Sequence, residues 1–232
     1  MLQHVPNILT FTRLGLAILF FSMLGYYQFD GRGAPTFLNL ASVVYLLALA
    51  TDFLDGYLAR RWKAEGAFGR VFDPLVDKVL VLGSFIFFAG KNFIIPWTAD
   101  PNSPYIHTES FIARTITGVA PWMVVVMLAR ELLVTSFRGL SESEGRRFGA
   151  DWSGKIKMGV QSVTILIILI YVNYLPWLQQ GGYERLDAAL MTVRDVAIWT
   201  TLIVTVLSGL LYIRRALRGT KRPEPVGSVA AA

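Results

Sequence analysis

The chain has 232 residues, of which 54% are hydrophobic and only 16% are charged, and its mean hydropathy is +0.50. A soluble domain of this length is far more polar, so the composition excludes an ordinary soluble enzyme and favours a single integral membrane domain. The chain contains no cysteine, which excludes disulfides and thiolate metal sites. We attribute the net charge of +6 to cytoplasmic loops that face anionic lipid, and not to nucleic-acid binding.

Six apolar segments approach or exceed the roughly 20 residues that a helix needs to cross a bilayer. Open strands cannot span lipid and no segment alternates like a barrel strand. We therefore expect an all-α integral membrane protein with six transmembrane helices and a polar active-site cavity that faces the cytoplasm. We expect this domain to cover residues 1–220 and the tail, 221–232, to be disordered. The six segments are 7–28, 37–60, 71–95, 118–138, 155–177 and 192–214.

The loop charges predict the orientation of these helices. The N-terminus, the 60–70 loop, the 138–157 loop and the C-terminal tail contain 14 of the 22 Lys and Arg residues, the opposite loops contain 5, and three lie inside helices. The side with more positive charge is cytoplasmic, so we expect both termini to face the cytoplasm. The first apolar stretch carries Arg13 and no small-residue cleavage site follows it. We therefore expect a membrane helix there and not a cleaved signal peptide.

Four aspartates interrupt the second and third apolar segments. Asp52 and Asp55 are three residues apart, and Asp73 and Asp77 are four apart, so each pair shares one face of its helix. An ionised side chain at mid-membrane costs roughly 2.5–3.5 kcal/mol, so four of them cost on the order of 10 kcal/mol unless cations compensate them. A pair of divalent metal ions is the simplest compensation.

The four carboxylates are expected to meet at one depth. Asp52 lies about 12 Å before Arg60 and Asp77 lies about 10 Å after Arg70 at 1.5 Å per residue, and the short loop makes the two helices antiparallel neighbours. Four oxygen ligands suit Mg²⁺ or Mn²⁺. The two histidines, His4 and His107, lie away from the acidic run, so a histidine-rich zinc site does not fit.

Small residues near the acids leave room for a ligand. Gly56 and Ala59 lie one turn apart and Gly69 precedes Asp73, which would allow a nucleotide to approach the backbone. Taken alone, these residues are more typical of helix packing, and only the neighbouring acids favour a ligand. The acids also admit two other interpretations, a proton or cation relay in a transporter and structural ion pairs. The pairs would involve Lys78, Arg60 and Arg70.

The full acidic run is D-x2-D-G-x2-A-R-x8-G-x3-D-x3-D, and here it resembles the signature of the CDP-alcohol phosphotransferase family at every fixed position. The resemblance implies transfer of a substituted phosphate from a CDP-linked lipid to an alcohol, with CMP leaving. It implies that two divalent ions are held by Asp52, Asp55 and Asp73 with help from Asp77, and that Asp77 is the general base. It also implies a homodimer among membrane lipids. The implied nucleotide-binding residues are Asp52, Gly56, Ala59, Arg60, Gly69 and Asp73.

Other segments resemble the bacterial branch of this family that joins CDP-diacylglycerol to sn-glycerol 3-phosphate in the inner membrane. These segments are Pro6 to Thr10, Ala129-Arg130-Glu131 and Gly154-Lys155-Ile156-Lys157. A phosphorylated acceptor needs cations, for which Arg suits bidentate contacts and Lys a point charge. The candidates are Arg130, Arg138, Lys155 and Lys157. The alternatives are an internal pair between Arg130 and Glu131, lipid contacts for the other three, and serine or inositol phosphate as the acceptor.

Overall fold

The structure is a computed structural model that describes most of the chain. It describes the backbone outside residues 1–4, 29–36, 63–66, 95–114, 144–151 and 220–232. Within the helices it describes the backbone alone, without side chains, at 5–8, 53, 55–62, 67–74, 141–143, 153 and 216–219. The tail predicted to be disordered lies outside the described residues, so the proposed domain boundary stays a prediction.

The prediction of an all-α chain is confirmed for the described residues. Six long helices follow one another, and one turn of 3-10 helix, η2 (Lys91–Phe93), follows the third. The helices are α1 (Val5–Tyr26), α2 (Phe37–Trp62), α3 (Ala67–Phe88), α4 (Pro121–Ser143), α5 (Trp152–Gln180) and α6 (Glu184–Gly219).

The last helix differs most from its predicted segment, 192–214. It begins at Glu184 and continues to Gly219. Glu184 and Asp187 lie in its first turn, where carboxylates interact favourably with the positive end of the helix dipole. An apolar window ends at charged residues, whereas the backbone hydrogen bonds of a helix continue through them. Hydropathy therefore underestimates the length of this helix.

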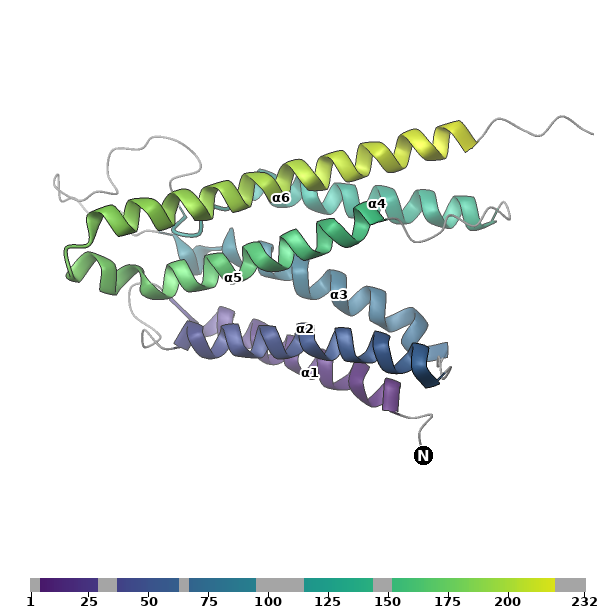
Figure 1. The fold of residues 1–232 in the computed structure, drawn as a ribbon, viewed down its shortest axis with the longest axis horizontal. Coiled ribbons are helices and arrows are strands. Elements are labelled where there is room, and N and C mark those ends of the chain that lie inside the picture. The colour runs from purple at the N-terminus through teal and green to yellow at the C-terminus, as the bar shows by residue number, and fades with distance from the viewer. Residues whose placement is uncertain (1–4, 29–36, 63–66, 95–114, 144–151, 220–232) are drawn as a thin grey trace, which may run out of the picture.

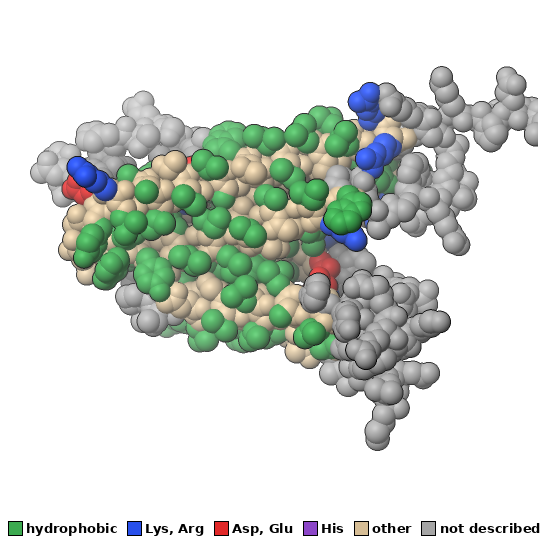
Figure 2. Space-filling view, viewed as in Figure 1, with side chains coloured by type: hydrophobic (Ala, Val, Ile, Leu, Met, Phe, Trp, Pro, Cys, Tyr) green, Lys and Arg blue, Asp and Glu red, His purple; other side chains and the backbone are tan. Residues whose placement is uncertain are grey.

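Three described stretches are long and apolar enough to cross a membrane: Leu9–Tyr26, Gly154–Gln180 and Glu184–Arg215. The apolar part of α2, Phe37–Asp52, is shorter. The face in Figure 2 is covered by hydrophobic side chains along its middle, and charged side chains lie at its two ends. This distribution is typical of a bundle that spans a bilayer, while the full count of six spans stays a prediction.

The helices lie side by side along the long axis of the molecule (Figure 1). The beginning of α1, the end of α2, the beginning of α3 and the end of α6 lie at the same end of the bundle (Figure 1). Contacts are most extensive between α5 and α6, between α1 and α2, and between α4 and α6, while α5 also packs on α2 and α3. The acidic and basic segments of the sequence therefore belong to one packed body.

An aromatic core closes the opposite end of the bundle. Phe88 packs edge-on against Phe93 with ring centroids 5.6 Å apart, and Tyr27 packs on Phe93 at 5.5 Å. The Asn92 amide donates hydrogen bonds to the Leu24 and Gly25 carbonyls at 3.1 and 3.0 Å, which ties η2 to the end of α1.

Close packing between α1 and α3 generates a prediction about stability. A Cβ added at Gly83 would lie 2.5 Å from Cζ of Phe21, whose ring stacks on Phe87. We expect Gly83→Ala to destabilise the protein by about 1–3 kcal/mol through overpacking. Gly15→Ala is the matched control because a Cβ there meets nothing within 4 Å. Thermal unfolding in detergent tests this, and equal midpoints for both variants would contradict the packing.

Candidate active site

A single buried guanidinium joins the two acidic helices. Arg13 of α1 is fully buried, and its Nη1 lies 3.0 Å from Oδ1 of Asp52 in α2 and 3.0 Å from Oδ1 of Asp77 in α3. Since both oxygens contact the same nitrogen, they are separated by at most twice that distance. The structure therefore brings the first and last aspartates of the acidic run together.

The two inner aspartates belong to the same helices. Asp55 follows Asp52 in α2 and Asp73 precedes Asp77 in α3, and both helices are continuous through these positions. The side chains of Asp55 and Asp73 lie outside the described residues, as do those of Gly56, Ala59, Arg60 and Gly69. Among the described side chains, no three carboxylate, histidine or cysteine groups gather into a metal-ligand cluster.

The Arg13 site has the chemistry of a hard-cation site. Its described ligating groups are carboxylates, which are the donors that Mg²⁺ and Mn²⁺ prefer. Asp52 is 45% exposed and Asp77 is 23% exposed, whereas the Arg13 side chain is only 1% exposed. One guanidinium leaves a net charge of −1 on the two acids. The residues therefore fit divalent cations, with Arg13 behind the carboxylates and Asp52 open to a ligand.

A second group of charged residues connects the helices α4, α5 and α6. Arg130 Nη1 donates to Oε1 of Glu131 at 2.7 Å, and the Lys157 ammonium of α5 contacts the same carboxylate oxygen. Arg130 Nη2 also donates to Oγ of Ser208 in α6 at 2.9 Å. The structure thus brings two of the four acceptor-site candidates together. The internal pair of Arg130 with Glu131, which was the alternative from the sequence, is present.

The other two acceptor-site candidates are exposed on the surface and do not belong to this buried pair. Arg138 is exposed near the end of α4, and Lys155 is exposed near the beginning of α5. The Lys155 ammonium lies 5.4 Å from the ring centroid of Trp152, within the range of a cation–π contact. Lys157, two residues later, is buried and turns into the bundle.

Lys78 connects the acidic and basic groups. It directly follows Asp77, and its ammonium donates to Oγ1 of Thr135 in α4 at 2.7 Å. Thr135 in turn donates to the backbone carbonyl of Glu131 at 2.7 Å. Sequence reasoning considered Lys78 only as an ion-pair partner of the acids, and it missed Ser208 and the sharing of Glu131. The charged pair Arg130-Glu131 inside an apolar segment was the available signal.

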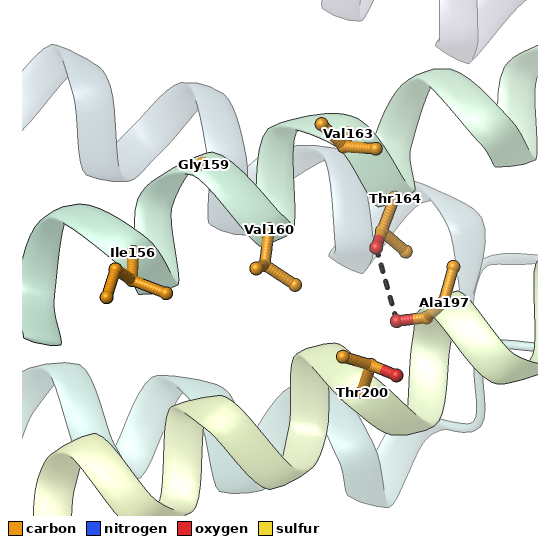
Figure 3. A pocket seen from close by; sticks show the side chains of 7 residues that line it. All are labelled: Ile156, Gly159, Val160, Val163, Thr164, Ala197 and Thr200. Carbon is orange, nitrogen blue, oxygen red and sulfur yellow. Dashed lines mark hydrogen bonds between the residues drawn. The ribbon is translucent and has the colours of Figure 1, made fainter.

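Two apolar cavities lie between the later helices. One of about 420 Å³ lies between α5 and α6, where Ile156 and Val160 face Thr200 and the Thr164 hydroxyl donates to the Ala197 carbonyl (Figure 3). The other, of about 240 Å³, lies between α4 and α6 and includes Arg130 in its lining. Neither is the polar cavity expected from the sequence. That cavity would be lined by α2 and α3, and many of the side chains of these two helices lie outside the described residues.

Comparisons with known proteins identify relatives along most of the chain. The family model described as CDP-alcohol phosphatidyltransferase matches residues 3–207. Three relatives carry the name CDP-diacylglycerol–glycerol-3-phosphate 3-phosphatidyltransferase. The Cereibacter sphaeroides relative is 31% identical over 165 residues, covering 64% of this chain and 71% of its own length. The Bacillus subtilis relative is 25% identical over 218 residues, covering 91% and 94%. The Salmonella typhimurium relative is 28% identical over 181 residues, covering 77% and 82%.

The Arg13 bridge generates a prediction about stability and its dependence on Mg²⁺. Arg13→Met keeps much of the side-chain volume but leaves two carboxylates close together without the guanidinium. We expect the unfolding midpoint in EDTA to fall by roughly 5–10 °C, with partial recovery in saturating Mg²⁺, which supplies positive charge to the acids. Arg185→Met, at an exposed position near the start of α6, is the control. An Arg13→Met midpoint equal to wild type in EDTA would show that the bridge contributes little.

Proposed function

This chain belongs to the CDP-alcohol phosphatidyltransferase family, and we propose that it transfers the phosphatidyl group of CDP-diacylglycerol to sn-glycerol 3-phosphate. The products are phosphatidylglycerol phosphate and CMP, so the reaction belongs to phospholipid biosynthesis. The relatives described above carry the name of this activity. The observation that carries the proposal is that Asp52 and Asp77, the outer acids of the complete family signature, meet at the buried Arg13.

The proposed metal site comprises the four aspartates of the signature. Members of the family generally use divalent metal ions. Asp52, Asp55, Asp73 and Asp77 would hold two ions, Mg²⁺ or Mn²⁺, which would supply positive charge to the diphosphate and to the leaving phosphate. The convergence of Asp52 and Asp77 supports this site, and the helical spacing places Asp55 and Asp73 one turn from them.

The chain's own residues would perform the remaining chemistry. Asp77 would accept the proton of the acceptor hydroxyl, whose oxygen forms the new bond to the phosphorus of the phosphatidyl group. The bond from that phosphorus to the CMP oxygen breaks, and CMP leaves with the electron pair. Arg13 would fix the orientation of Asp77 through the 3.0 Å contact. Placement and charge neutralisation are the main contributions of a protein to phosphoryl transfer.

Substrate binding is assigned to two regions of the chain. The cytidine diphosphate would lie along α2 and α3 at Asp52, Gly56, Ala59, Arg60, Gly69 and Asp73, an assignment that rests on the signature. The acceptor phosphate would bind to Arg130 and Lys157, which the structure brings to one carboxylate. Arg138 and Lys155, exposed on the helices that carry this pair, would attract the anion from solvent.

We also propose the arrangement in the membrane. Residues 1–220 would form six transmembrane helices in the inner membrane of a bacterium, with the active site and both termini cytoplasmic and the protein a homodimer. The loop charges favour this orientation. The common end of the bundle at which α1 begins and α6 ends is consistent with an even number of spans (Figure 1).

An assay of the purified protein tests this function directly. We expect release of CMP from CDP-diacylglycerol that requires both sn-glycerol 3-phosphate and Mg²⁺ or Mn²⁺, and that EDTA abolishes. Serine and inositol phosphate serve as competing acceptors in parallel reactions. Turnover with either of these but not with sn-glycerol 3-phosphate would reassign the acceptor. Failure to release CMP with any acceptor would contradict a transferase and favour a transporter.

The proposed base generates a separate prediction. Asp77→Asn keeps the side-chain shape but cannot accept the proton, so we expect turnover to fall by about 10²–10⁴-fold. Binding of CDP-diacylglycerol should remain measurable. Asp187→Asn is the matched control because Asp187, at the start of α6, accepts a hydrogen bond from the Tyr171 hydroxyl that an Asn oxygen also accepts. Full activity of Asp77→Asn would remove Asp77 from the mechanism.

A further inference from the structure

We propose that Glu131 is a positioning residue that holds Arg130 and Lys157 together as a binding site for the doubly charged phosphate of the acceptor. The proposal rests on the proposed function, since it explains how this protein distinguishes its phosphorylated acceptor. It assigns to Glu131 a part in acceptor affinity that goes beyond a structural ion pair.

The contact geometry shows why the carboxylate is needed. One oxygen, Oε1 of Glu131, contacts both the Arg130 guanidinium and the Lys157 ammonium. All three side chains are largely buried, with exposures of 11%, 8% and 3% for Arg130, Glu131 and Lys157. Two cations held this close repel each other strongly in a medium of low dielectric constant. The negative charge between them therefore allows both to remain at one point inside the bundle.

Arg130 is also fixed from the side of α6. Its Nη2 donates to Ser208, and a Cβ added at the adjacent Gly209 would lie only 2.9 Å from Cγ of Arg130. Glycine at this position thus permits the side chain to pass across α6. The Arg130 Nε has no hydrogen-bond partner among the described residues. An unpaired buried N–H is unfavourable, and a phosphate oxygen would satisfy it.

The local charge balance favours an anion. Lys78 reaches Thr135, whose hydroxyl donates to the Glu131 carbonyl, so a third cation lies next to the pair. Arg130, Lys157 and Glu131 together carry a net charge of +1 within an apolar bundle, and Lys78 lies between this group and Asp77. A phosphate monoester carries about −1.5 to −2 at neutral pH, so the acceptor would neutralise this excess. Serine, a zwitterion with no net charge, offers no comparable compensation.

Three roles for Glu131 predict different kinetics. A positioning role predicts weaker acceptor binding when the charge is removed, because Arg130 and Lys157 move apart. A purely structural role predicts lower stability and lower activity, with both substrates affected equally. A role as a competitor for the cations predicts tighter acceptor binding, because the phosphate no longer displaces a carboxylate.

The test is Glu131→Gln, which keeps the shape and removes the charge. We expect KM for sn-glycerol 3-phosphate to rise on the order of 10–100-fold, as for loss of hydrogen bonds to a charged group. KM for CDP-diacylglycerol should change far less, because Glu131 contacts Arg130 and Lys157, which are assigned to the acceptor, and Glu131→Asp should restore part of the acceptor affinity. Glu184→Gln, exposed at the start of α6, is the control. An unchanged or lower acceptor KM, or equal increases for both substrates, would overturn the proposal.

A second variant keeps the proposal testable if Glu131→Gln does not fold. Gly209→Ala should displace Arg130 from the side of α6 and raise the acceptor KM in the same selective way, whereas an unchanged acceptor KM would contradict the arrangement.

Equilibrium binding of sn-glycerol 3-phosphate to the wild type and both variants separates the Glu131 proposal from the proposed function. If the wild type binds this anion but does not turn it over, the proposed function fails. The affinities of the wild type and the two variants for the anion can still be compared, and weaker binding by the variants would support the Glu131 proposal. If wild type turns over and the variants bind equally well, only the Glu131 proposal fails.

Discussion

The shared contact of Arg13 with Asp52 and Asp77 is the interaction on which the rest of the site depends. Carboxylates inside an apolar bundle are unfavourable unless cations meet them, and a guanidinium with both acids at 3.0 Å meets two of them at once. The contact also joins three helices, α1, α2 and α3. It therefore restricts their relative rotation and also compensates part of the negative charge of the two aspartates. One guanidinium leaves a net charge of −1 on Asp52 and Asp77, which fits the divalent cations proposed for this site.

The need to pair buried charges also explains the second group, Arg130, Glu131 and Lys157, on the other side of the bundle. Glu131 joins α4 to α5 through Lys157, and Arg130 extends the group to α6 through Ser208. The hydrogen bond from Lys78 to Thr135 connects this basic group with the acidic one across α3 and α4. The bundle therefore places the carboxylates of the proposed metal site near the cations of the proposed acceptor site. That arrangement suits a reaction in which a metal-bound diphosphate meets a phosphorylated alcohol.

The sequence predicted the features that depend on local periodicity. The six helices follow from apolar length, and the meeting of Asp52 with Asp77 follows from helical spacing and a short connection. Arg13 could not be assigned from spacing, because its partners lie on two other helices and only tertiary packing selects them. For the same reason Glu131 was seen as a partner of its neighbour Arg130 but not of Lys157, which comes from α5. The length of α6 was underestimated because hydropathy ends at charges that a helix backbone tolerates.

The central claim is that the two acidic helices form one pocket for a pair of divalent ions. Electron paramagnetic resonance of Mn²⁺ bound to the protein in lipid nanodiscs tests it most directly, because two ions about 3.5–4 Å apart give a spin-coupled spectrum. The account predicts two Mn²⁺ per chain with such coupling, and loss of the coupled signal in Asp52→Asn. A single isolated Mn²⁺, or two uncoupled ions that survive Asp52→Asn, would contradict it.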